Sequence, residues 1–134
     1  MTFVNRYGIT LAADLYKPKN ASGKYPAIAV SGPFGAVKEQ CSGLYAQTMA
    51  ERGYLTIAFD PSFTGESGGY PRFMASPDIN TEDFMAAVDF LSVREDVDPD
   101  KIGIIGICGW GGMALNATAL DTRIKATVAS TMYD

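Results

Sequence analysis

Hydrophobic and polar positions alternate along the chain in a pattern that predicts strands and helices in turn. Two short β-like runs flank a Tyr7-Gly8 turn and indicate an antiparallel hairpin. Continuous apolar runs, which are typical of strands covered on both faces, recur further along the chain. The predicted strands are residues 2–6, 10–16, 25–31, 55–59, 102–107 and 125–130.

Helical spacing of apolar residues predicts three helices between these strands. The first covers residues 42–52, and the third is short, at about residues 111–119. The second follows a loop rich in Gly, Ser and Pro at residues 61–77, and we expect Asn80 or Thr81 to cap it.

The order of these elements predicts one α/β domain. A turn at residues 98–100 is expected before the third buried strand, because Asp-Pro-Asp is typical of turns. A hairpin followed by alternating strands and helices implies a three-layer α/β/α sandwich, with a mostly parallel sheet and an N-terminal antiparallel hairpin. Ligands in such folds bind beyond the carboxyl ends of the strands. That rule points to residues 32–35, 60–69 and 106–112.

Composition excludes several classes of function. The chain has 134 residues, of which 47% are hydrophobic, and a net charge of -4, so nucleic acid is not an expected partner. No apolar run approaches the roughly 20 residues of a membrane helix and no signal segment is evident, so we expect a cytoplasmic protein with no membrane partner. Cys41 and Cys108 form no CxxC pair and the chain has no histidine, so no disulfide framework, metal or cofactor is expected.

The strongest chemical signal is the glycine-dense corner at residues 106–112. A strand-to-helix turn there would hold Cys108 at an exposed tip, and glycines let the backbone turn sharply. The N-terminus of the following helix would favour an anionic sulfur at the same place. These are the requirements of a covalent nucleophile. The alternative is a small buried cysteine that closes a strand.

The approach to this corner, residues 98–108, resembles the nucleophile elbow of α/β-hydrolases. Cysteine in place of serine is similar to the dienelactone-hydrolase branch, and the wider chain resembles dienelactone-hydrolase-like and polyketide-transferase-like proteins. The resemblance implies a hydrolase or acyl transferase that acts on the ester, lactone or thioester bond of a small-molecule acyl substrate through Cys108. It is carried by residues 32–40, 60–61, 64–69 and 76–84.

The resemblance also implies an oxyanion hole made of two backbone N–H groups. Gly109, the residue after the nucleophile, donates one of them. The loop at residues 32–35 donates the other, and Pro33 has no N–H, so Phe34 is the expected donor. Gly35 is the alternative donor and a candidate contact for the substrate. An ordinary strand-ending turn is the competing interpretation of this loop.

One position departs from the family's pattern, which has a small residue two places after the nucleophile. Trp110 stands there, and Gly111 and Gly112 follow one step late. Either the turn carries an extra residue, or the register shifts and Trp110 occupies the nucleophile position, which would make the protein non-catalytic. We favour Cys108 as the nucleophile and Trp110 as a wall of the substrate cleft, with core packing as its alternative role.

The other members of a catalytic triad are missing from the chain. In this fold the acid and the histidine follow the nucleophile, but only Asp121 and Asp134 do so here. We expect Asp121 to be solvated, and residues 1–134 to be the N-terminal part of a single α/β-hydrolase domain that is inactive alone. Asp60 precedes the nucleophile and is expected to tie down its own loop through backbone N–H groups.

Two non-catalytic functions remain open. A phosphate-binding module would use the helix N-terminus after Gly109, but neither GxxxxGK[ST] nor GxGxxG is met. A self-associating remnant would use the last predicted strand, at residues 125–130, whose unpaired edge could pair with another copy. For that reason we expect the isolated chain not to be a stable monomer and to form a homo-oligomer.

Overall fold

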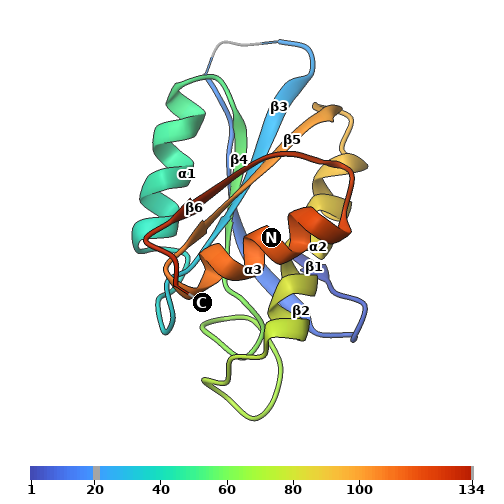
Figure 1. The fold of residues 1–134 in the computed structure, drawn as a ribbon. Helices are drawn as coiled ribbons and strands as arrows, with labels where there is room; N and C mark the ends of the chain where they lie inside the picture. Colours follow the sequence, from blue (N-terminus) through green and yellow to red (C-terminus); the bar gives the residue numbers. More distant parts are fainter. Residues whose placement is uncertain (20–21, 134) are drawn as a thin grey trace.

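A six-stranded mixed sheet runs through the molecule (Figure 1), and the computed structural model describes residues 1–19 and 22–133. The strands lie in the order β1-β2-β4-β3-β5-β6. β1 pairs with β2 and β2 with β4 in antiparallel orientation, whereas the other pairs are parallel. The elements are β1 (Thr2–Val4), β2 (Thr10–Tyr16), β3 (Tyr25–Ser31), α1 (Cys41–Glu51), β4 (Leu55–Phe59), α2 (Pro77–Ser92), β5 (Val97–Ile107), α3 (Gly109–Leu120) and β6 (Ile124–Ser130).

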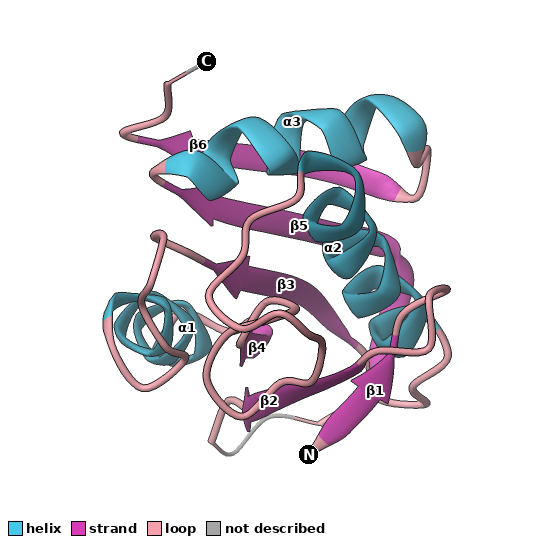
Figure 2. Cartoon of the chain, turned by 90° about the horizontal axis from the view of Figure 1, so that it is seen from below, coloured by secondary structure: helices cyan, strands magenta, loops and turns pink. Residues whose placement is uncertain are grey.

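Helices cover both faces of this sheet, which confirms the predicted three-layer α/β/α sandwich. Figure 2 shows α1 on one face and α2 with α3 on the other. The larger core lies under α2 and α3 and contains Phe59 and Phe84, whose rings meet edge to face at 5.4 Å. A smaller apolar cluster lies under α1 and includes Val30 and Ala46. The continuous apolar runs of β3 and β4 are explained by burial on both faces.

Two predicted boundaries were wrong. Helix α2 begins at Pro77 rather than near Thr81, because Ser76 caps it by accepting a hydrogen bond from the Ile79 N–H at 3.4 Å. A proline suits the first helical position, where its missing N–H is not needed. Residues 98–100 lie within β5 and form no separate turn: Tyr25 pairs with Val97 and Ala27 with Ile102, so the residues between bulge from the ladder.

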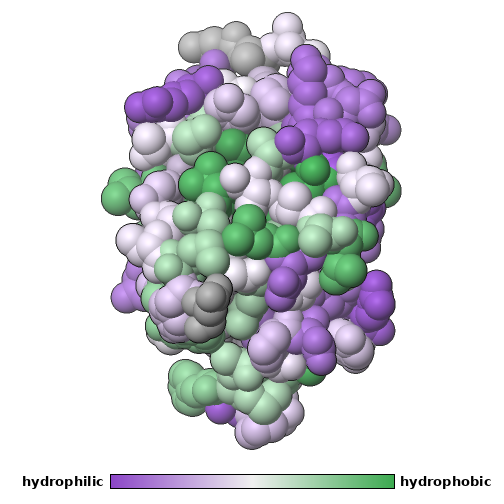
Figure 3. Space-filling view, viewed as in Figure 1, coloured by the Kyte–Doolittle hydropathy of each residue, from purple (hydrophilic) through white to green (hydrophobic). Residues whose placement is uncertain are grey.

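Strand β6 lies at one edge of the sheet and β1 at the other. Val128 of β6 is 53% exposed. Apolar and weakly polar residues occupy the middle of the face that β6 crosses (Figure 3). A groove of about 550 Å³ follows this part of the sheet, lined by residues of β3, β5 and β6 together with Met49 and Tyr54. Within residues 1–19 and 22–133, no helix has the length and apolar character that crossing a bilayer requires.

Candidate active site

Cys108 lies at the tip of the sharp turn that joins β5 to α3. Its backbone angles, a φ of 60° and a ψ of -129°, fall in a region that residues other than glycine rarely adopt. Gly109 begins the helix directly after it. The Cys108 N–H donates to the carbonyl of Ser130 at 2.8 Å, and the Cys108 carbonyl accepts from the Gly111 N–H at 2.9 Å. Strained residues of this kind are held in place only where the surrounding structure fixes them, and they gather at functional sites.

The two glycines beside Cys108 leave room for this turn. A Cβ on Gly106 would overlap the backbone carbonyl of Trp110, and a Cβ on Gly109 would overlap the ring of Phe34. Any side chain at either position would push the strand, the helix or the Phe34 loop apart. The local sequence therefore accounts for a tight corner with the thiol at its tip.

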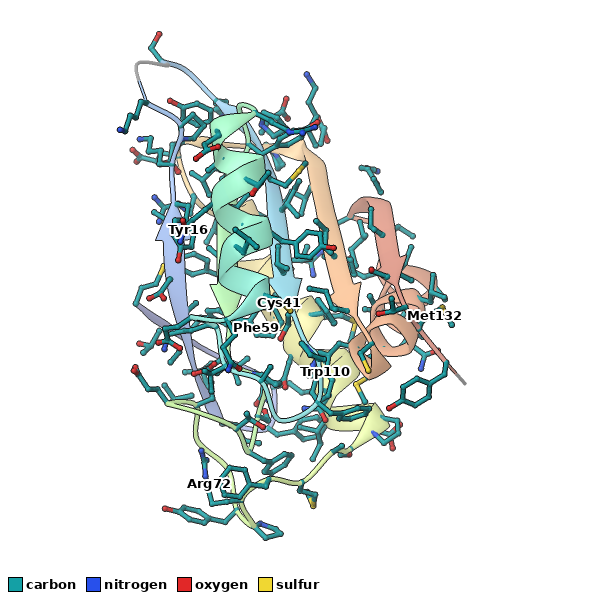
Figure 4. All side chains as sticks on the ribbon, turned by 90° about the vertical axis from the view of Figure 1, so that its left-hand side faces the viewer. Tyr16, Cys41, Phe59, Arg72, Trp110 and Met132 are labelled. Atoms are coloured by element: carbon teal, nitrogen blue, oxygen red, sulfur yellow. The ribbon has the colours of Figure 1, made fainter. Side chains whose placement is uncertain are left out.

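The position of Trp110 shows which residue lies at the tip of the corner. Its side chain is 1% exposed and belongs to the core cluster under α2 and α3, so it does not occupy the position at the tip. The indole of Trp110, which Figure 4 labels, packs edge to face against Phe34, with ring centroids 4.5 Å apart. The register shift that would have put Trp110 in place of the nucleophile does not occur. Trp110 lies behind Phe34 and supports that ring.

The loop after β3 brings further backbone donors to the corner. Phe34 is 41% exposed, and its ring lies against the position where Gly109 would carry a side chain. Across residues 1–19 and 22–133, the N–H groups of Phe34, Gly35 and Gly109 donate to no protein acceptor. Free N–H groups next to a thiol are the kind of donor that stabilises a developing oxyanion.

A buried ion-pair network holds this loop in place, and the sequence analysis identified only its acid. Asp60, 1% exposed, accepts hydrogen bonds from the Lys38 N–H at 2.7 Å and the Glu66 N–H at 2.9 Å. The prediction that Asp60 ties down its loop is confirmed. It does more, since the same carboxylate also fixes the segment after Gly35.

Lys38 is the buried cation of this network. Its side chain is 4% exposed, and its Nζ lies 3.4 Å from Asp60, 2.7 Å from Glu39 and 3.3 Å from Glu66. Burial alone would lower the pKa of Lys38, but hydrogen bonds and attraction from these carboxylates raise it above its ordinary value. Lys38 therefore stays charged. We call Lys38, Glu39, Asp60 and Glu66 the Lys38 network.

Asp83 is a second buried acid whose role the sequence did not reveal. It accepts hydrogen bonds from the side chains of Asn5 and Asn80 at 2.9 and 3.0 Å. It also accepts from the N–H and hydroxyl of Ser62 at 2.8 and 2.7 Å. Burial raises the pKa of Asp83 against the opposing effect of these donors. The carboxylate joins the N-terminal hairpin, the loop after β4 and α2.

Asp121, the first acid that follows Cys108 in the sequence, does not lie at the corner. Asp121 ends α3, at the opposite end of that helix from Cys108. The prediction that it is solvated was wrong: it is 8% exposed, and Arg123 donates to it at 2.6 Å. That hydrogen bond lowers the pKa of Asp121, although burial opposes the shift. Asp134 lies outside the described residues.

Tyr133 is a neighbour of Cys108 that the sequence analysis missed. Its side chain is 56% exposed and lies near the Cys108 thiol. Desolvation and this neighbouring thiol raise the pKa of Tyr133. The ring of Tyr133 lies 6.3 Å from that of Phe34, across the beginning of α3. No pattern within residues 124–133 distinguishes this tyrosine from other exposed residues.

Both rings line a pocket of about 380 Å³, which we call the elbow pocket. It lies at the carboxyl ends of the strands, where α/β folds bind ligands, whereas the larger sheet groove reaches Asp100 and Lys101 near the opposite end of β5. The elbow pocket is lined by Phe34, Pro77, Gly109, Gly112, Met113, Leu115, Asn116, Met132 and Tyr133.

Comparisons with known proteins agree with this geometry. Residues 7–133 match the model of the family described as X-Pro dipeptidyl-peptidase (S15 family). The chain is 73% identical over 135 residues to the uncharacterized protein PA2218 of Pseudomonas aeruginosa, covering 100% of this chain and 36% of that protein. The crystal structure of PA2218 superimposes with a TM-score of 0.97 over 100% of this chain and 42% of that one.

More distant relatives carry enzymatic names. The thiohydrolase aneE of Aspergillus aculeatus is 33% identical over 127 residues, which cover 95% of this chain and 39% of that protein. The structure of Est1E from Butyrivibrio proteoclasticus, solved with ferulic acid bound, is 26% identical with a TM-score of 0.87, over 98% of this chain and 52% of that one. The chain thus spans well under half the length of these curated relatives.

Proposed function

The chain belongs to the X-Pro dipeptidyl-peptidase (S15) family, within the α/β-hydrolase superfamily, and we propose that it supplies the nucleophile and the oxyanion hole of an enzyme that cleaves or transfers acyl groups. The bonds would be those of esters, lactones or thioesters, as in the dienelactone-hydrolase-like branch. The observation that carries the proposal is Cys108 in a strained turn at the N-terminus of α3, beside unpaired N–H groups.

In this proposal the Cys108 thiolate attacks the carbonyl carbon of the substrate and forms a tetrahedral intermediate. The N–H groups of Gly109 and of Phe34, or alternatively Gly35, donate to its oxyanion. Loss of one such donor typically costs about 3 kcal/mol of transition-state stabilisation. The intermediate collapses to a thioester and expels the leaving group. Residues 1–134 contain no histidine, so the base for later hydrolysis or transfer comes from outside them.

The first chemical step can be tested on this chain with p-nitrophenyl acetate. The p-nitrophenolate leaving group departs as an anion, so acylation of a thiolate needs no general acid. We expect a burst of about one equivalent of p-nitrophenolate per chain, followed by slow turnover or none. Mass spectrometry should locate the acetyl group on Cys108, and Cys108→Ala should abolish the burst.

Cys41 provides the matched control. It is partly buried, its Sγ lies 3.7 Å from the Gly32 carbonyl, and burial raises its pKa. We expect Cys41→Ala to keep the whole burst, and iodoacetamide to alkylate Cys108 on the order of ten times faster than Cys41. Equal slow alkylation of both thiols would contradict an activated nucleophile.

We also propose that β6 pairs with β6 of a second copy. Support comes from its edge position and from the exposure of Val128, since an unprotected edge strand is a template for pairing. Light scattering during size exclusion should then give about twice the 14.3 kDa of the chain. For the Val128→Lys variant we expect the mass of one chain. A monodisperse wild-type monomer in dilute solution would reject this assembly.

A further inference from the structure

The elbow pocket lies beside the atoms that would carry out the reaction. Gly109, the expected oxyanion donor, is part of its lining. Tyr133 lines the pocket and lies near the Cys108 thiol, and Phe34 lines it as well and covers Gly109. A carbonyl carbon attached to the sulfur would therefore have its substituent at the mouth of the pocket.

Apolar side chains make up most of the pocket walls. Met113 is buried, at 7% exposed, whereas Leu115, Met132 and Tyr133 are exposed to solvent. Asn116 contributes the amide group, and among the described residues that line the pocket none carries a charged side chain. Transfer of an apolar group from water into such a space is favourable, whereas a carboxylate would lose its hydration without finding a cation.

The size of the pocket limits what can enter. Its volume of about 380 Å³ is near the lower end of ligand pockets, which span roughly 300–1,000 Å³. Gly109 and Gly112 leave the first turn of α3 bare of side chains at this point. The rings of Phe34 and Tyr133, with centroids 6.3 Å apart, are close enough to interact with each other, so a ligand would lie beside them rather than between them.

We propose that the elbow pocket receives the acyl part of the substrate, and that this acyl group is uncharged, apolar and about the size of one aromatic ring. This inference rests on the proposed function of Cys108 and names the class of substrate that the site selects. Acyl groups that carry a carboxylate are disfavoured.

Alkylating reagents test the pocket separately from the oxyanion hole, because alkylation forms no oxyanion. The Cys108 thiolate displaces bromide from the CH₂ carbon of 2-bromoacetophenone or of bromoacetate, forming a C–S bond as the C–Br bond breaks. We expect the ratio of the two rates at Cys108, aromatic ketone over carboxylate, to exceed the same ratio for glutathione by about tenfold. That factor corresponds to partial burial of one ring. A ratio equal to that of glutathione would overturn the proposal.

Gly112→Leu should fill the pocket while keeping the fold. Among residues 1–19 and 22–133, a Cβ on Gly112 would meet only the Tyr133 carbonyl, at 3.6 Å, and leucine favours a helix more than glycine does. We expect this variant to lose the preference for 2-bromoacetophenone and to react normally with iodoacetamide. Ala119→Leu, on an exposed position of α3 that does not line the pocket, should keep the preference. A preference retained in Gly112→Leu would also overturn the proposal.

The two proposals fail in distinguishable ways. If p-nitrophenyl acetate gives no burst but the aromatic preference is present, the oxyanion hole fails and the pocket stands. If the burst occurs without any aromatic preference, the nucleophile stands and the acyl pocket is rejected.

Discussion

Replacing Trp110 with alanine is expected to lower the free energy of unfolding by about 3–5 kcal/mol, the usual cost of removing a large aromatic side chain from a core. Trp110 is 1% exposed and contacts the larger core on one side and Phe34 on the other. Its loss would leave a cavity directly under the corner that holds Cys108. A change of this size in a domain of this length corresponds to a fall in Tm of about 10–20 °C.

Urea unfolding followed by circular dichroism measures this effect, and Trp110→Phe is the control. The indole N–H of Trp110 has no hydrogen-bond partner among the described residues, so phenylalanine loses no polar contact. It also keeps a ring against Phe34. We expect Trp110→Phe to cost less than half as much as Trp110→Ala. Similar costs for the two variants would show that ring packing is not what stabilises the corner.

Asp60→Asn is expected to destabilise the protein by a similar amount, about 3–5 kcal/mol, because it leaves the Lys38 ammonium buried without its buried carboxylate. The carboxylate of Asp60 also receives two backbone N–H groups from two different loops. An asparagine amide has one oxygen and a nitrogen that donates, so one of the two N–H groups would face another donor. Both loops should therefore become looser.

Glu66→Gln tests the same network from its exposed end. The Glu66 side chain is 72% exposed, so its ion pair with Lys38 should contribute less than about 1 kcal/mol. Urea midpoints of the two variants measure the difference. In Asp60→Asn we also expect acylation by p-nitrophenyl acetate to slow more than alkylation by iodoacetamide, since only acylation needs the Phe34 loop. Equal slowing of both reactions would mean that Asp60 acts on the nucleophile instead.

Much of the sheet could be predicted from the sequence because its strands are buried on both faces. The runs that became β3 and β4 are continuously apolar, and their short length between turn signals favours strands over buried helices. The corner at Cys108 could be predicted because a strand leads directly into a helix there, with Gly106 and Gly109 on either side of the cysteine. In the structure, Cys108 and not Trp110 lies at the tip of this corner.

The parts that could not be predicted depend on contacts between distant segments. The local role of Asp60 could be predicted, but its pairing with Lys38 could not, because only the packing of two loops buries the two charges together. The expected cap at Asn80 or Thr81 would put Asp83 in the first helical turn, but α2 begins earlier, at Pro77, and Asp83 is hydrogen-bonded to Asn5. The bulge in β5 carries the composition of a turn, so local chemistry alone could not tell the two apart.

The parallel pairing of β3 with β5 has a consequence for folding. Ser31 pairs with Gly106, so the residues that immediately precede the Phe34 loop and Cys108 are neighbours in the sheet although α1, β4 and α2 separate them in the sequence. Closing so long a stretch of chain costs entropy before any contact compensates for it, and such non-local pairing slows folding. During refolding, Cys108 should therefore react as an ordinary thiol until this late pairing is complete. The time course of its alkylation would report when the centre of the sheet forms.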